Sequence, residues 1–486
     1  MDTASIRHLK RGRLTYSLGA LIALALVSAG ALFAFSPSRA ADPTAVGIAG
    51  RVGVDPVLAD SLAALAPEDL DPVAAAALAG TLMSASGEPA VWIGTERVVL
   101  HDDVVPFYRA RSLAPVWDDP TVRDTLLHTL RDSALDGFDP EVYHASALTN
   151  LAAALDARER PDAPEADTVA ADFDLALTDA LFRYADDASG ARTDPVELYA
   201  HLGMTAREAP TVASDLGAAL DAEDPAAAIA ALARGLQPQH AGYQNLRVAL
   251  GRVLDGSAPD TLSADLLRLN LERWRWLPDD LGDIHVLVDV PGYRAWVRER
   301  DTTGFADSFE MDVVVGKPGR WQTPVMTDTM ETIVFSPNWI IPASIQMESY
   351  GRVTPGRQQD PGPGNPMGRA KFLFPNDQAI YIHDTNSKWG FTRDYRALSH
   401  GCVRAADPRD FATEILTRTN GWTVDEVHER FEGPWRTESV TVDGTLPVHL
   451  TYFTAWADAD GTVSVWKDVY SRDRPLAEAL GLSLDA

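Results

Sequence analysis

The chain has 486 residues, of which 46% are hydrophobic, and carries a formal net charge of −28 at pH 7. This length and apolar content are enough for two or three globular domains, each with its own core. Because so acidic a surface repels phosphate backbones, the composition argues against a nucleic-acid partner.

The first 41 residues have the pattern of an export signal. A basic cluster, Arg7–Arg13, precedes an apolar run, Leu18–Phe35, and small residues follow at Ser38–Ala40. The run is long for a cleavable signal and short for a transmembrane helix, while Ser38–Ala40 fits a cleavage site for a signal peptidase. We therefore expect residues 1–41 to be a signal peptide or an uncleaved membrane anchor, with the rest of the chain exported.

Helices are predicted for most of the first half of the chain. Residues 42–94 are rich in Ala, Leu and Pro with weak periodicity, which indicates a loosely ordered leader. Residues 95–280 show helical periodicity, with the apolar stripe of Leu126, Leu127 and Leu130 as one example. Similar helices are predicted at 171–187 and 225–236.

The last predicted helix of this region begins at the N-cap Ser263 and ends before Pro278. The periodicity then changes to that of strands. Ile284, Val286, Val288 and Val290 fall on one face of a strand, and further strands are predicted at 310–319, 332–342 and 378–384.

Residues 281–435 are therefore predicted to form a mainly β domain, which contains a helix beginning at Asp407-Pro408. Residues 436–486 are predicted to form a hairpin, turning at Asp460-Gly461, and a tail packed on the preceding domains. The fold class expected from this order is α+β.

Cys402 is the only cysteine of the chain, and its neighbours point to thiol chemistry. A lone cysteine in an exported protein forms no internal disulfide, so it is either a small buried apolar residue or a reactive group. His383 ends a predicted strand 19 residues earlier, and His400 and Gly401 directly precede the thiol. A base and a tightly turning glycine, with the amides of Gly401 and Cys402 aimed at one oxygen, are what acyl transfer by a thiol needs.

Two other chemistries fit less well. His383, His400 and Cys402 are zinc-type ligands, but no fourth His or Cys stands at a recognisable spacing, so no metal site is predicted. In papain-like proteases the cysteine precedes its histidine, whereas here the histidine comes first.

The stretch 383–404, HDTNSKWGFTRDYRALSHGCVR, resembles the signature of the L,D-transpeptidases with a YkuD-type catalytic domain. In that family a histidine is followed after fifteen to twenty residues by Ser/Thr-His/Ser-Gly-Cys and then Arg or Asn. The flanking segments, from about residue 95 to the C-terminus, resemble the long Gram-negative subgroup, whose helical scaffold domain would correspond to residues 95–280.

Two departures from that subgroup affect substrate binding. Only residues 251–265 separate the helices where relatives often carry a small peptidoglycan-binding module, so this module is expected to be missing. Where relatives have a substrate-capping lid, the chain has only Gln346–Asp360, so any lid is expected to be small.

The resemblance implies that Cys402 is the nucleophile and that His383 is the general base, its ring oriented by a backbone carbonyl near Asp384. His400 then either carries a proton or only shapes the loop and lines the pocket. Arg404 either binds a substrate carboxylate or holds the loop.

The remaining site residues have structural alternatives. Gly401 and Ser399 belong to the geometry of the nucleophile loop. Trp339 and Tyr381 are either pocket walls or core residues, whereas Trp274, Trp276 and Trp296 are expected to pack between domains rather than to stack on sugars.

The function implied is that of a periplasmic enzyme acting on peptidoglycan stem peptides. Its thioester would release D-alanine and pass the acyl group to a second diaminopimelate, with no metal or organic cofactor and with the family's susceptibility to carbapenems. Transfer to water or to an envelope protein stays open, as does a wall-binding module with a vestigial site. A membrane contact is expected only through an uncleaved N-terminal segment.

Overall fold

The computed structural model describes residues 77–78, 89–93, 95–157, 164–199, 212–301 and 304–484. The chain divides into two units, Met1–Asp60 and Ser61–Ala486, and all described residues belong to the second. The predicted export signal and most of the predicted leader lie outside the described residues. Along the described ranges, no helix combines the length and the apolar character that crossing a bilayer requires.

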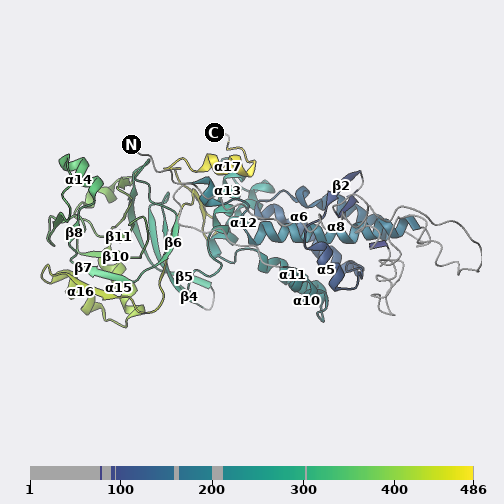
Figure 1. The fold of residues 1–486 in the computed structure, drawn as a ribbon, viewed down its shortest axis with the longest axis horizontal. Coiled ribbons are helices and arrows are strands. Elements are labelled where there is room, and N and C mark those ends of the chain that lie inside the picture. Colours follow the sequence, from purple (N-terminus) through teal and green to yellow (C-terminus); the bar gives the residue numbers. More distant parts are fainter. Residues whose placement is uncertain are drawn as a thin grey trace, which may run out of the picture. The chain divides into compact units, whose positions relative to one another are not determined.

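The N-terminal part of the described chain is helical (Figure 1). A short antiparallel hairpin, β1 (Ala90–Ile93) and β2 (Glu96–Val99), precedes it. The helices are α5 (Val104–Ala110), α6 (Pro120–Asp132), α7 (Ala145–Asp156), α8 (Pro164–Ser189), α9 (Pro195–Leu198), α10 (Val212–Leu220), α11 (Pro225–Leu236), α12 (Ala241–Leu254) and α13 (Ala264–Arg275), with 3₁₀ turns at Ser133–Asp136 and Pro140–Tyr143. The predictions for 171–187 and 225–236 are confirmed by α8 and α11.

Local sequence signals account for the ends of these helices. Asp119 caps α6 by accepting a hydrogen bond from the Thr121 amide, and Pro120 occupies the first turn. Ser263 caps α13 by accepting from the Leu266 amide, as predicted. The predicted stripe of Leu126, Leu127 and Leu130 is buried in the helical core.

The following part is built around a mixed sheet. Its strands are β3 (Ile284–Asp289), β4 (Arg294–Asp301), β5 (Gly304–Gly316), β6 (Met326–Thr329), β7 (Thr332–Phe335), β10 (Ala370–Leu373), β11 (Ile382–His383), β12 (Ala397–Ser399), β13 (Val403–Ala405), β14 (Glu438–Thr441) and β15 (Pro447–Thr451). The order is β14-β7-β10-β11-β13-β5-β4-β3-β15-β6, and β12 pairs with β5. Helices in the first region and a mainly β second region confirm the α+β class.

Two predicted strands are shorter or interrupted. The strand predicted at 332–342 divides into β7 and β8 (Trp339–Ile340), because Ser336 has a left-handed φ of 43° and Pro337 has no amide to donate. The strand predicted at 378–384 is reduced to β11, because Ala379 has a left-handed φ of 53° in a turn held by Asn376.

The segment expected to be at most a small lid lies between two short strands. β8 pairs antiparallel with β9 (Gln358–Gln359), and α14 (Ala343–Tyr350) lies between them in the chain. Gln346 fixes this segment, since its side chain donates to the Ile341 carbonyl and accepts from the Thr354 amide.

The C-terminal segment enters the main sheet. β14 pairs with β7 at one edge, and β15 lies between β3 and β6. β16 (Ala455–Ala457) and β17 (Val463–Val465) form the predicted hairpin, in which Gly461 takes a left-handed φ of 87°. The chain then forms α17 (Asp473–Leu480), whose Asp473 pairs with Arg273 of α13 at 2.7 Å.

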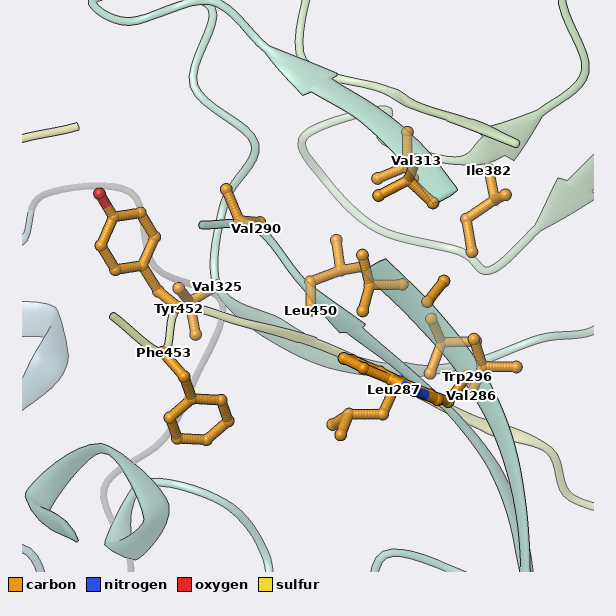
Figure 2. Close-up of a cluster of buried hydrophobic side chains, with 14 of the residues drawn as sticks. Val286, Leu287, Val290, Trp296, Val313, Val325, Ile382, Leu450, Tyr452 and Phe453 are labelled. Atoms are coloured by element: carbon orange, nitrogen blue, oxygen red, sulfur yellow. The ribbon is translucent and has the colours of Figure 1, made fainter. Parts of the chain in front are cut away.

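Apolar side chains from several strands form a continuous core. Figure 2 shows Val286 and Leu287 of β3, Trp296 of β4, Leu450 of β15 and Phe453 gathered in one cluster. The helices α15 (Pro408–Thr419) and α16 (Val424–Glu432) pack on the sheet, and the Phe411 ring of α15 lies 4.7 Å from the Phe372 ring.

The predicted packing role of the three tryptophans is confirmed. The Trp274 ring stacks on Phe453 with centroids 4.5 Å apart, and Trp296 stacks on Trp456 at 5.2 Å. Each of Trp274, Trp276 and Trp296 is at most 9% exposed, so none offers a face to a sugar.

Candidate active site

Three neighbouring strands present two different faces. In β10, β11 and β13, Phe372, Ile382 and Val403 point into the core and are fully buried. The register pairs Lys371 with His383 and His383 with Arg404, so these three side chains share the opposite face. The sheet thereby separates an apolar side, packed on α15, from a polar side.

Cys402 lies at the start of β13 on this polar side. β11 and β13 are parallel, and the Val403 amide donates to the Tyr381 carbonyl at 3.1 Å, which places Cys402 beside Tyr381. The half-buried thiol donates to the Ala379 carbonyl with an S···O distance of 3.8 Å. The 18 residues between His383 and Cys402 therefore form a connection between adjacent strands.

Burial raises the pKa of the Cys402 thiol above its ordinary value. Hydrogen bonding from Tyr381 and the positive charges of Lys371 and Arg404 act in the opposite direction, since each favours the thiolate. The resting group at neutral pH is therefore the thiol, and a base must remove its proton.

His383 has the geometry of such a base. Its Nδ1 donates to the Asp384 carbonyl oxygen, an atom that can only accept, so the neutral ring keeps its lone pair on Nε2. Burial, together with the positive charges of Arg404, Lys371 and Lys388, lowers the pKa of His383 to about 3. The orientation of the ring by a backbone carbonyl near Asp384 is as expected from the sequence.

The Asp384 carboxylate fixes the strand end that carries His383. One oxygen accepts from the Arg369 amide at 2.7 Å, and the other accepts from the Thr385 amide and from Lys388 Nζ, at 2.7 and 2.8 Å. Gly368 allows this close approach, because a Cβ there would lie 2.2 Å from the carboxylate. Asp384 thus holds the base in place through the main chain.

The nucleophile loop depends on Gly401, as predicted. Its φ of 114° lies in the region that glycine favours, and a Cβ would lie 3.1 Å from Ile380. Ser399 sets the loop geometry by accepting from the Gly401 amide at 3.1 Å and donating to the Cys402 carbonyl at 2.6 Å. The expectation that the Gly401 amide points at substrate is therefore wrong for this structure, because Ser399 occupies it.

Residues far away in the sequence anchor this loop. The buried Thr323 hydroxyl donates to the Gly401 carbonyl at 2.7 Å and accepts from the Gly316 amide at 2.9 Å. The Tyr470 hydroxyl donates to the Gly316 carbonyl at 2.6 Å and accepts from the Thr323 amide at 3.1 Å. The C-terminal segment thereby supports the loop that carries the thiol.

His400 of the nucleophile loop contacts Glu348 and Trp321. Its Nε2 lies 3.0 Å from the Glu348 carboxylate of α14, and its ring lies 4.7 Å from the Trp321 ring. This hydrogen bond from His400 lowers the pKa of Glu348. The contact with Glu348 connects the nucleophile loop to the segment expected to be a small lid.

The other predicted site residues lie on two different groups of strands. Arg404 and Tyr381 are on the polar face with Cys402, and burial raises the pKa of Tyr381. Trp339 lies on the separate β8–β9 pair, in register with Gln359. Within the described ranges, no group of three or more His, Cys, Asp or Glu side chains is arranged to hold a metal ion.

Comparison with known families identifies both regions. Residues 102–250 match the model of a scaffold domain, and residues 283–428 match that of the L,D-transpeptidase catalytic domain, together more than half of the chain. The chain belongs to the L,D-transpeptidase family. The second match contains His383 and Cys402.

Two individual proteins with sequence similarity to this transpeptidase-family chain share less than a third of the aligned residues with it. A Haemophilus influenzae protein, whose name assigns it provisionally to the L,D-transpeptidases, is 29% identical over 247 residues, which are 43% of this chain and 48% of the relative. The chain thus spans about half the length of that curated relative. A solved structure titled as the Ldtfm-avibactam carbamoyl enzyme is 15% identical, covers 35% of this chain and 49% of that one, and has a TM-score of 0.20.

Sequence reasoning missed several residues of the site. Thr323 and Tyr470 carry no local signal, since their contacts with the loop arise only from the fold. Lys371 stands one residue before the buried Phe372 in a strand, and only alternation with Phe372 could have placed its side chain on the polar face. The Asp384 side chain could have been proposed from its position directly after the histidine.

Proposed function

We propose that the chain is a cysteine-dependent acyltransferase that forms L,D cross-links in peptidoglycan. One observation carries the proposal: a thiol and a neutral, oriented imidazole lie on the same face of two paired parallel strands, within a domain of this family. These are the nucleophile and base that thiol-mediated acyl transfer needs.

In the first half-reaction the sulfur of Cys402 attacks the carbonyl that joins diaminopimelate to the terminal D-alanine. The thiol proton passes to Nε2 of His383 as the C–S bond forms. The C–N bond then breaks, the D-alanine nitrogen takes the proton from the imidazolium, and the stem peptide remains as a thioester.

In the second half-reaction the side-chain amine of another diaminopimelate attacks the thioester. The amine loses a proton to His383, the C–S bond breaks, and the sulfur recovers a proton. A new amide joins two stem peptides, and atoms and charges balance over the cycle.

The low pKa of His383 suits proton delivery. An imidazole whose pKa is about 3 is a weak base at rest, but its protonated form is a strong acid that readily protonates a leaving amine. Arg404, which shares the polar face, suits a substrate carboxylate near the thioester. The proposed setting is the periplasm, where stem peptides are the partners and envelope proteins are further candidate acceptors.

Mass spectrometry of muropeptides tests this proposal. The purified full chain is incubated with disaccharide tetrapeptides, and the products are compared with those of Cys402→Ala. We expect cross-linked dimers that have lost one D-alanine, formed only by the unsubstituted protein. Tripeptide monomers without dimers would replace the proposal with a carboxypeptidase, and unchanged substrate would overturn it.

A further inference from the structure

Lys371 lies on the polar face of the sheet without an acidic partner. It faces His383 across the β10–β11 pair, and it is half-buried. Among the residues that the structure describes, no carboxylate lies within ion-pair distance of its ammonium group. A cation that is partly withdrawn from water and unpaired is costly, unless an anion occupies the site at some stage.

The ammonium group of Lys371 lies over a ring that borders the thiol. Its Nζ is 3.8 Å from the centroid of the Tyr381 ring, a cation–π contact. Tyr381 is the residue whose carbonyl accepts the Val403 amide, and its side chain interacts with the Cys402 sulfur. Lys371 therefore contacts the Tyr381 ring, and its positive charge favours the thiolate of Cys402.

Two other lysines, Lys388 and Lys467, have different environments. Lys388 Nζ is bound by the Asp384 carboxylate at 2.8 Å and by the Ala406 carbonyl at 2.9 Å, so its charge is largely neutralised. Lys467 lies over a different ring, that of Tyr395, at 5.9 Å. Of these three lysines, only Lys371 combines a ring contact with a charge that acts on Cys402.

We propose that Lys371 is a positioning residue of the site, whose ammonium group fixes Tyr381 over the nucleophile and stabilises the anionic sulfur as Cys402 loses its proton. In this proposal the thiolate of Cys402 is the anion that balances the positive charge of Lys371. The inference rests on the proposed function, because it assigns Lys371 to the activation of the same nucleophile.

Three side chains favour the thiolate of Cys402: Lys371 of β10, Tyr381 directly before β11, and Arg404 of β13. The titratable neighbours His383 of β11 and His400 of the loop also lie close to Cys402 in the chain or on the same sheet face. An opposite charge within about 4–6 Å lowers the pKa of a group by roughly 1–3 units. Since Lys371 is half exposed, we expect an effect of about one unit, or about tenfold in the thiolate fraction.

Alkylation of the single cysteine measures this ionisation without substrate. The rate of reaction of the full chain with iodoacetamide is recorded from about pH 6 to about pH 11, because burial raises the pKa of the Cys402 thiol. In Lys371→Met, which keeps most of the length of the side chain without the charge, the midpoint should rise by about one unit. Lys371→Arg should retain the midpoint, and Lys467→Met, the matched control, should leave it unchanged.

Two results would overturn the assignment. One is an unchanged midpoint in Lys371→Met, and the other is an equal rise in Lys371→Arg, which would indicate shape rather than charge. If Lys371→Met does not fold by circular dichroism, Lys371→Gln is the second neutral variant, with the same two criteria. Because alkylation needs no acyl donor, these results are separate from the muropeptide test of the proposed function.

Discussion

Removal of the Thr323 hydroxyl should loosen the nucleophile loop while the rest of the protein stays folded. Thr323→Val has nearly the same shape, but it deprives the buried Gly401 carbonyl and the buried Gly316 amide of their partner. A buried polar group left without a partner costs about 1–3 kcal/mol, so the two groups together cost about 2–6 kcal/mol. We expect the lower half of this range, because small shifts of the loop can restore one bond.

The same substitution should slow acylation. A misplacement of about 1 Å at a reacting group can reduce a rate about 10²-fold, and Gly401 directly precedes the nucleophile. The assay combines urea unfolding with the rate of carbapenem acylation, followed by intact-protein mass spectrometry. Thr323→Ser, which keeps the hydroxyl, should recover most of both quantities.

The control for this experiment is Thr413→Val. The Thr413 hydroxyl donates to the Arg409 carbonyl within its own helix, at 2.9 Å, so its removal leaves no buried group at the site without a partner. The reasoning is refuted if Thr323→Val has the stability and the acylation rate of the unsubstituted protein. A loss of stability with an unchanged acylation rate would limit Thr323 to a structural role.

The remaining predictions concern the nucleophile and the two histidines. Incubation with a carbapenem should add one drug molecule per chain, seen by intact-protein mass spectrometry and absent in Cys402→Ala; an unmodified unsubstituted protein would contradict the nucleophile assignment. His383→Ala should slow pre-steady-state acylation about 10²-fold or more, and His400→Ala should cost less; the reverse order would exchange their roles. Because the pKa of His383 is lowered to about 3, its ring should stay neutral at pH 5, so the acylation rate should show no inflection near pH 6.5 on the acidic side; an inflection there would show that His383 titrates normally.

The elements with strong local signals were predictable. The helix predicted at 225–236 has the bounds of α11, and the cap at Ser263 is present, because capping and periodicity are decided within a few residues. The sequence motif spans two adjacent strands, since His383 of β11 is in register with Arg404 of β13, two residues after Cys402.

The features that the sequence did not predict depend on tertiary contacts or on the conformation of single side chains. The strand predicted before His383 is shortened because Asn376 holds a turn in which Ala379 is left-handed, and a hydrophobic pattern does not reveal such a turn. The engagement of the Gly401 amide by Ser399 depends on the rotamer of one hydroxyl. The contact of Thr323 with the loop spans 78 residues, beyond any local rule.

The position of Tyr470 also has a consequence for the order of events during folding. Chains are made from the N-terminus, and segments pair only after both partners have been synthesised. β15 lies inside the sheet, and Tyr470 fastens Gly316 and Thr323 beneath the nucleophile loop. The thiol is therefore made about 70 residues before the support of its loop is complete, so a newly made chain reaches its competent geometry only after the C-terminal strands have joined the sheet. The fold in this way delays the competent geometry of the nucleophile loop until the segment around Tyr470 has been made.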